Sequence, residues 1–250
     1  MATLVRERRR LFVGNKFLFI ANLTISDLLF GVVMIYNMVT VFYAELSYAG
    51  CLSLFMLIEF ALRLSNLSLV LIAVDQYVTI AYALRSGDIL TPTRVWGALA
   101  ALWATLVVVA LLPAAGWRAR GNTRCLLLKV HSPSYLLTFD VLLFYAPAVV
   151  MTTMYARIFA IARRHLREIA AQELVAADAG VASRARSIRR EVKMSVTIVI
   201  VIVAFVASWA PMIVIRDVES AWPDTYRSTD VFLPYTIAAC NSFYNPFIYV

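Results

Sequence analysis

Charged residues are scarce in this 250-residue chain. Asp, Glu, Lys and Arg make up 15% of it, against about a quarter of an average soluble domain, whereas hydrophobic residues make up 62%. The hydrophobic residues gather in runs of about twenty or more, the length that a helix needs to cross roughly 30 Å of hydrocarbon. The composition therefore excludes an ordinary soluble domain and predicts membrane-spanning helices.

Histidine and cysteine are also rare. The two histidines, His131 and His165, and the three cysteines form no cluster with metal-ligand spacing. No nucleophile with a nearby base and no glycine-rich phosphate loop is visible, so we expect neither an enzyme nor a cofactor. The net charge of +8 lies in the loops between apolar runs, which argues against nucleic acid as a partner.

Six apolar runs are long enough to span a membrane, and we expect them to form a single domain over residues 1–250. The predicted spans cover residues 17–43, 52–80, 95–114, 134–160, 193–215 and 231–250. Residues 161–192 are polar and rich in Ala and Arg, as is typical of helix extensions around a mobile cytoplasmic loop. The predicted fold class is an all-α membrane protein.

Lys and Arg are distributed unequally across the membrane. If the spans alternate in direction, sixteen of the 23 Lys and Arg lie on the side of the N-terminus and six lie on the other side. The positive-inside rule then makes the side with more Lys and Arg cytoplasmic. Cys51 and Cys125 fall on the extracellular side, where oxidising conditions favour a disulfide between them, and we expect Cys240 to remain a free thiol.

Three prolines fall inside the last three spans: Pro147, Pro211 and Pro246. Proline removes a helical hydrogen bond, so each of them predicts a local kink and a freed backbone carbonyl. The alternative is that these prolines are merely tolerated, but three of them favour a bundle that bends.

Several polar side chains also fall inside the spans, where a charge costs at least about 2.5–3.5 kcal/mol. Asp27, Ser65, Asn241 and Asn245 offer hard oxygen ligands for one small cation. An interhelical hydrogen-bond cluster without an ion is the alternative, and spacing alone favours it.

Glu59 and Arg63 are four residues apart and therefore lie on one helical face. They either neutralise each other or anchor the polar head of a ligand, and the sequence leaves both interpretations open.

Short motifs along the whole chain resemble those of rhodopsin-like G-protein-coupled receptors, from the second family helix to the seventh. The similar segments are LTISDLL, LIAVDQYVTI, FVASWAP and NPFIY, together with Cys51 and Cys125, Trp103, Pro147 and Tyr155. The resemblance implies a seven-transmembrane-helix bundle represented here by six spans, family helices 2 to 7, without the first helix. It also implies a location in the plasma membrane, among membrane lipids.

The resemblance implies three functional sites. An allosteric sodium ion would be held by Asp27, Ser65, Trp209, Asn241 and Asn245. An extracellular small molecule would contact Ile58, Glu59, Leu62, Arg63, Asp140, Met212, Ile213 and Arg216. Coupling to a heterotrimeric G protein would use Asp75, Gln76, Tyr77, Tyr155, Glu191, Phe205, Trp209, Pro211 and Tyr249.

Within the family, the chain is most similar to adenosine receptors and their lipid-sensing relatives. Its ligand positions differ from the adenosine pattern, with Leu127, Leu128 and Arg216 where purine-binding residues would stand. Ile58 occupies the place of the amine-binding Asp of aminergic receptors, and Ala239 that of the retinal-binding Lys of opsins. An amphiphile with a polar or charged head suits this mixture of residues best.

Two positions depart from the family pattern. Gln76 stands where the family has an Arg that pairs with two acids, which correspond to Asp75 and Glu191 in this chain. The loss of this Arg predicts poor or atypical G-protein coupling. Asn66 replaces a bulky apolar residue and is expected to alter the switch around Pro147 and Phe205. A non-signalling protein that modulates another receptor is therefore an alternative, whereas a transporter would need inverted repeats or paired broken helices, and neither is visible.

Overall fold

The computed structural model describes residues 2–43, 47–82, 85–118, 130–173, 179–223, 225–226 and 232–239. This part of the chain is helical, apart from turns and one isolated bridge between Arg118 and His131. The helices are α1 (Ala2–Tyr43), α2 (Tyr48–Ala81), α3 (Ser86–Ile89), α4 (Pro92–Leu111), α5 (Pro133–Asp140), the π-helical turn η1 (Val141–Tyr145), α6 (Ala146–Glu173), α7 (Ala179–Ala221) and α8 (Phe232–Ala239).

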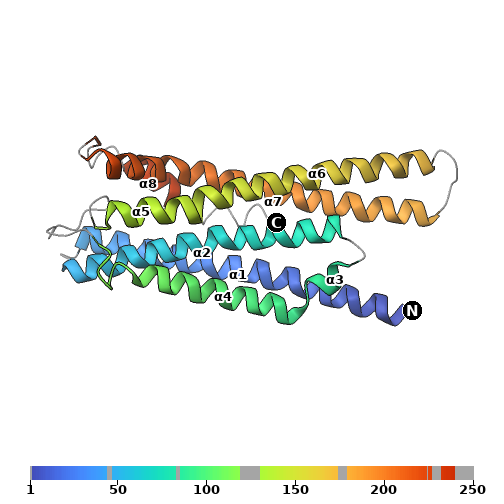
Figure 1. Cartoon of the computed structure of the whole chain (residues 1–250), viewed down its shortest axis with the longest axis horizontal. Helices are drawn as coiled ribbons and strands as arrows, with labels where there is room; N and C mark the ends of the chain where they lie inside the picture. Colours follow the sequence, from blue (N-terminus) through green and yellow to red (C-terminus); the bar gives the residue numbers. More distant parts are fainter. Residues whose placement is uncertain are drawn as a thin grey trace.

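The long helices lie side by side along one axis, with α2 at the centre (Figure 1). Helix α2 packs against α1, α4 and α6, while α7 packs against α6 and α8. In the most apolar stretch of α2, 72% of the residues are buried, against 28–39% in the other candidate spans. Helix α2 therefore carries the residues that can meet several other helices at once.

Five helical segments are long and apolar enough to cross a membrane: Asn15–Thr40, Tyr48–Ala81, Pro92–Leu111, Pro133–His165 and Ser195–Ala221. The all-α fold and five of the six predicted spans are confirmed. The sixth, residues 231–250, is represented only by α8, and its remainder lies outside the described residues. The fifth segment ends later than predicted, so Arg216 lies inside a span and not in an extracellular loop.

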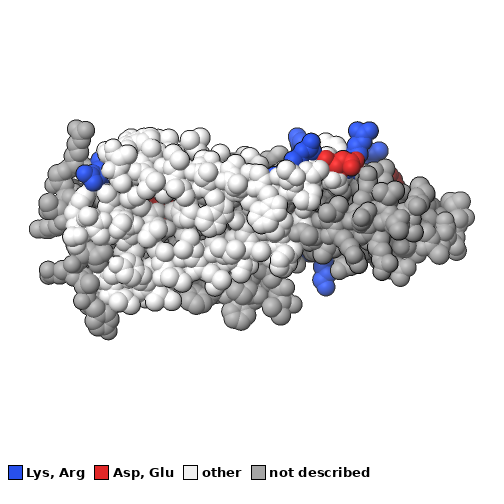
Figure 2. Space-filling view, turned by 90° about the horizontal axis from the view of Figure 1, so that it is seen from below, with Lys and Arg blue, Asp and Glu red and all other residues white. Residues whose placement is uncertain are grey.

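The face shown in Figure 2 has the charge distribution of a membrane protein. Lys, Arg, Asp and Glu side chains gather toward the ends of the described surface and leave a broad uncharged belt between them. Large apolar side chains such as Phe17, Leu28, Val108 and Val149 are exposed in the helices. Lipid is the environment in which such a surface is stable.

The start of α5 is set by two local signals. Ser132 accepts a hydrogen bond from the backbone N–H of Tyr135 at 3.3 Å, and Pro133 occupies the first helical turn, where no N–H partner is needed. Because the first turn is fixed in this way, the sequence places Tyr135 on the buried side of α5, where it is 0% exposed.

Pro147 follows the single π-helical turn η1 in the described residues. The prediction of a freed carbonyl near this proline is confirmed at Leu143, four residues earlier, whose oxygen accepts a hydrogen bond from Asn66 of α2. Helix α7 continues through Pro211 without leaving the α-helical class. Pro246 lies outside the described residues.

Candidate functional site

Four buried charged side chains meet near the outer ends of α2, α5 and α7. Glu59 and Arg63 come from α2, Asp140 from the end of α5 and Arg216 from α7. Arg63 lies 2.8 Å from Glu59 and 3.6 Å from Asp140, and the two terminal nitrogens of Arg216 donate to the same two carboxylates. We call this set the charge cluster.

The charge cluster is neutral and almost entirely withdrawn from solvent. Its members are 3–7% exposed, and it holds two carboxylates and two guanidinium groups. An isolated buried charge is strongly unfavourable, so each member is stabilised only while its partners remain in place. The cluster thus ties three helices together at one point.

Aromatic side chains of α5 surround one of the two arginines. Arg63 donates a hydrogen bond of 2.8 Å to the hydroxyl of Tyr135, which itself donates to the carbonyl of Val109 in α4. The Arg63 guanidinium also lies 5.2 Å from the Tyr135 ring centre and 5.6 Å from that of Phe139. Arg63 is therefore held by ion pairs, a hydrogen bond and two cation–π contacts together.

His131 packs against the same aromatic group, with its ring centre 5.2 Å from that of Tyr135. It lies just before α5 and is 4% exposed. Burial lowers the pKa of His131 to about 4, because this effect and the nearby arginines outweigh the attraction of Glu59. At neutral pH, His131 is therefore uncharged and adds nothing to the balance of the charge cluster.

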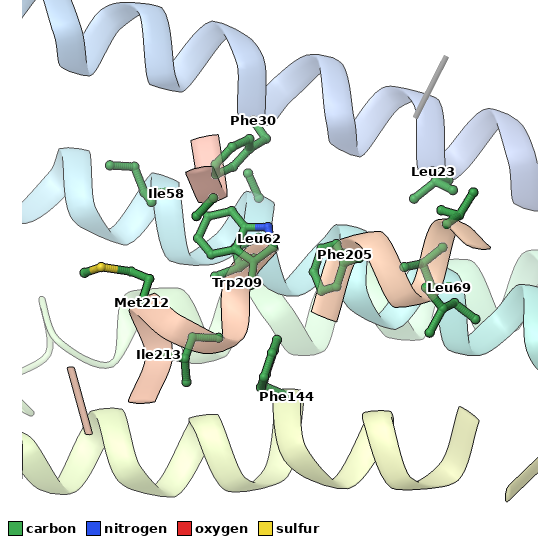
Figure 3. Close-up of a cluster of buried hydrophobic side chains, with 14 of the residues drawn as sticks. Leu23, Phe30, Ile58, Leu62, Leu69, Phe144, Phe205, Trp209, Met212 and Ile213 are labelled. Carbon is green, nitrogen blue, oxygen red and sulfur yellow. The ribbon is translucent and has the colours of Figure 1, made fainter. Parts of the chain in front are cut away.

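An apolar layer follows the charge cluster toward the cytoplasmic half. Figure 3 shows Trp209 beside Phe30, with Ile58, Leu62, Met212, Ile213 and Phe144 nearby. The Trp209 ring centre is 5.2 Å from that of Phe30 and 6.3 Å from that of Phe205. Arg216 follows Trp209 by about two turns on α7, so the charge cluster and the aromatic layer share one continuous helix.

A small cavity joins the charge cluster to the apolar layer. Its wall includes the charged residues Arg63 and Asp140, the amide of Asn66 and the apolar residues Leu62, Phe144 and Ile213. It is about as large as a single water molecule requires. A ligand of several heavy atoms can enter only if a member of the wall or of the charge cluster moves.

Asp27 and Ser65 are in direct contact across α1 and α2, with the Ser65 hydroxyl donating to the Asp27 carboxylate. The same hydroxyl lies 3.2 Å from the hydroxyl of Ser26. Two oxygen atoms suited to bind a hard cation therefore meet between these helices. Both the ion-binding interpretation and the hydrogen-bond interpretation require this contact. Asn241 and Asn245, which were predicted to complete the set, lie outside the described residues.

Of the predicted coupling residues, Asp75, Gln76 and Tyr77 lie in the last two turns of α2, and Tyr155 lies in the first half of α6. Gln76 is 2% exposed and its side-chain oxygen has no hydrogen-bond partner among the described residues, although Asp75 beside it is engaged. Tyr155 is buried, and the Tyr77 ring packs edge-on against that of Tyr82 at 6.3 Å. The Glu191 side chain and Tyr249 lie outside the described residues.

The sequence profile described as 7 transmembrane receptor (rhodopsin family) matches residues 1–249. The chain belongs to this family. The resemblance inferred from motifs is thus confirmed, and this rhodopsin-family chain is a multi-pass protein of the plasma membrane.

Two relatives illustrate how far the similarity extends. The alpha-1A adrenergic receptor of Cavia porcellus is 29% identical over 214 residues, which cover 74% of this chain and 46% of that receptor. The adenosine receptor A2a of Homo sapiens is 28% identical over 256 residues, which cover 92% of this chain and 60% of that receptor. The rhodopsin-family chain thus spans about half the length of the curated relatives it matches.

The eight predicted ligand-binding residues of this rhodopsin-family chain are all buried, and they divide into two groups. Four form the charge cluster, and four lie in the apolar layer: Ile58, Leu62, Met212 and Ile213. The pairing of Glu59 with Arg63 is confirmed. It is incomplete as a description, because both residues also share partners on α5 and α7.

Tyr135 and Phe139 were missed by sequence reasoning. They are four residues apart on α5 and precede Asp140, so an aromatic pair on one helical face next to a membrane-embedded acid was an available signal. Cys51 is disulfide-bonded. Since Cys125 and Cys240 lie outside the described residues, its pairing with Cys125 stays a prediction.

Proposed function

We propose that this chain is the core of a G-protein-coupled receptor, which binds an extracellular small molecule and acts on a heterotrimeric G protein. The observation that carries the proposal is the charge cluster, which connects α2, α5 and α7 two turns from Trp209. A ligand that rearranges these ion pairs acts directly on α7. No catalytic role is proposed for any residue.

The physical basis of signalling is differential binding. A ligand shifts a conformational equilibrium only by the difference in its affinity for the two states. In the described structure the charge cluster holds the outer end of α7 against α2 and α5. A ligand that replaces one of these ion pairs favours a state in which α7 is released, and the continuous helix transmits the displacement to its cytoplasmic half.

A reporter of G-protein recruitment in cells tests this function. We expect weak recruitment by the unmodified chain and at least a severalfold increase in Gln76→Arg at equal surface expression, because Gln76 offers no cation to the G protein. Trp209→Leu in the Gln76→Arg background should reduce the gain. Equal recruitment by all three, no greater than in cells without the chain, would contradict the proposal.

A non-signalling receptor-like protein is the second candidate, and Gln76 is the observation that favours it. Its amide replaces a charged group in a buried position where its oxygen has no partner among the described residues. A chain that reaches the cell surface, fails to recruit G protein even as Gln76→Arg, and changes the signalling of a co-expressed receptor would support this alternative.

We further propose that a sodium ion binds beside Asp27 and Ser65, with Trp209, Asn241 and Asn245 completing the site. The contact between the Asp27 carboxylate and the Ser65 hydroxyl supports it, because both are hard oxygen donors on separate helices. The ion would add a positive charge next to a carboxylate and would hold α1 and α2 together.

A further inference from the structure

We propose that Arg216 occupies the place of the ligand's charged group, and that the ligand is an organic cation with one positive charge and a compact apolar body. This inference rests on the proposed receptor function and names the chemical class of its ligand. In the described structure Arg216 neutralises Glu59 and Asp140, and the ligand cation takes over this role when Arg216 withdraws.

The two arginines of the charge cluster are held very differently. Arg63 has two carboxylate neighbours, the Tyr135 hydroxyl and two aromatic rings around it. Arg216 donates to the same two carboxylates. Each arginine also has one buried nitrogen without a hydrogen-bond partner among the described residues, Nη2 of Arg63 and Nε of Arg216. Arg63 therefore has contacts beyond the carboxylates, with Tyr135 and Phe139, that hold it in place when Arg216 departs.

The side chain of Arg216 can also reach the membrane surface. It lies five residues before the end of α7 at Ala221, a rise of about 7.5 Å along the helix. A long basic side chain at this depth can extend its guanidinium to the polar membrane surface. Glu59 and Asp140 have shorter side chains, so neither carboxylate can leave the buried site in this way.

The net charge of the site without Arg216 determines the sign of the ligand charge. Without Arg216 the site holds two carboxylates and one guanidinium, and therefore carries one net negative charge. A cation restores neutrality, whereas an anion would raise the buried charge further. This acid pair differs from the amine-binding position of aminergic receptors, which is Ile58 in this chain.

The cavity determines the chemical character of the uncharged part of the ligand. Its wall includes the carboxylate residue Asp140 and the apolar residues Leu62, Phe144 and Ile213, which come from α2, η1 and α7. The space that the Arg216 side chain vacates adjoins it through Asp140. An ammonium or guanidinium group at the carboxylates therefore places an attached ring or short alkyl chain against the apolar layer.

Three compounds of similar size and different charge test the inference: 3-phenylpropylammonium, 3-phenylpropionate and 3-phenylpropanol. The probe is the thermal unfolding of the full chain in lipid nanodiscs. We expect only the cation to raise the Tm, because a ligand stabilises the state that it binds. In Arg216→Gln, the cation concentration needed for half the effect should fall about tenfold, because the internal competitor is gone.

Two further variants serve as controls. Arg118→Gln removes an exposed arginine near the same side of the membrane and should leave the response to the cation unchanged. Glu59→Gln combined with Arg216→Gln vacates the same space but leaves Asp140 and Arg63 balanced. This double variant should lose the gain in affinity, and it also provides a neutral site if Arg216→Gln alone does not fold.

Stabilisation by the anion or equally by all three compounds would overturn the inference, as would a gain in affinity that persists in the double variant. The readout is independent of G protein. A chain that binds the cation without recruiting G protein contradicts the receptor function alone. A chain that recruits G protein but does not distinguish the three compounds contradicts the ligand class alone.

Discussion

Asn66 of α2 donates a hydrogen bond of 2.6 Å to the backbone carbonyl of Leu143 in η1. This carbonyl lies four residues before Pro147, which has no N–H to offer it. The amide of Asn66 therefore supplies a donor from another helix to a carbonyl that the proline leaves without its α-helical partner. The polar residue that departs from the family pattern is thus explained by the turn that it stabilises.

We expect Asn66→Leu to lower the free energy of unfolding by about 1–3 kcal/mol, because a buried carbonyl loses its partner. The thermal unfolding of the purified chain in nanodiscs measures this loss. Thr152→Val is a matched control, since its exposed hydroxyl donates to the Ala148 carbonyl of its own helix. An equal Tm for Asn66→Leu and the unmodified chain would show that the hydrogen bond is not stabilising.

The charge cluster predicts strong non-additivity between Glu59 and Arg63. Arg63→Met should destabilise the chain by about 3–5 kcal/mol, because it leaves two buried carboxylates with one cation. Glu59→Gln combined with Arg63→Met restores neutrality and should recover a substantial part of this loss. A double-mutant cycle on unfolding free energies measures the coupling, and an additive result would argue against direct pairing.

The contact between Asp27 and Ser65 predicts a specific effect of sodium. At constant ionic strength, replacing choline by sodium should raise the Tm of the unmodified chain, because the ion binds the folded state. The increase should disappear in Asp27→Asn and persist in Asp88→Asn, which alters an exposed acid on the cytoplasmic side. A sodium effect that survives in Asp27→Asn would place the ion elsewhere.

The burial of His131 predicts loss of stability in acid. Above its ordinary pKa of about 6.5 both the folded and the unfolded chain carry a neutral imidazole, so the ionisation of His131 does not change the free energy of unfolding there. Between pH 6.5 and about 4 the unfolded state binds a proton that the folded state excludes, so stability falls as pH falls. The accumulated loss is roughly 3 kcal/mol.

His131→Phe should remove this part of the pH dependence while keeping an aromatic ring beside Tyr135. The Tm of both chains measured from pH 7 to pH 4 provides the comparison. Identical profiles would mean that His131 is not the group responsible. Glu59, Arg63 and Arg216 are the charged groups that act on His131, and all three are retained in this variant.

The sequence alone determined the membrane class, the helical fold and the approximate limits of five spans, because hydropathy over twenty residues depends on local composition. It also placed Glu59 beside Arg63, since four residues along a helix is a local distance. It further predicted a freed backbone carbonyl near Pro147, because a proline has no N–H to donate. These properties need no knowledge of which helices are neighbours.

Only the tertiary structure decided which partners these groups have. Arg216 is separated from Glu59 by 157 residues and from Asp140 by 76, and the hydropathy pattern assigned it to an extracellular loop. The packing of α2 between α1, α4 and α6, and the longer course of α7, bring these charges together. A buried charge is stable only with a partner, and that partner is specified by the packing of helices that are distant in the sequence.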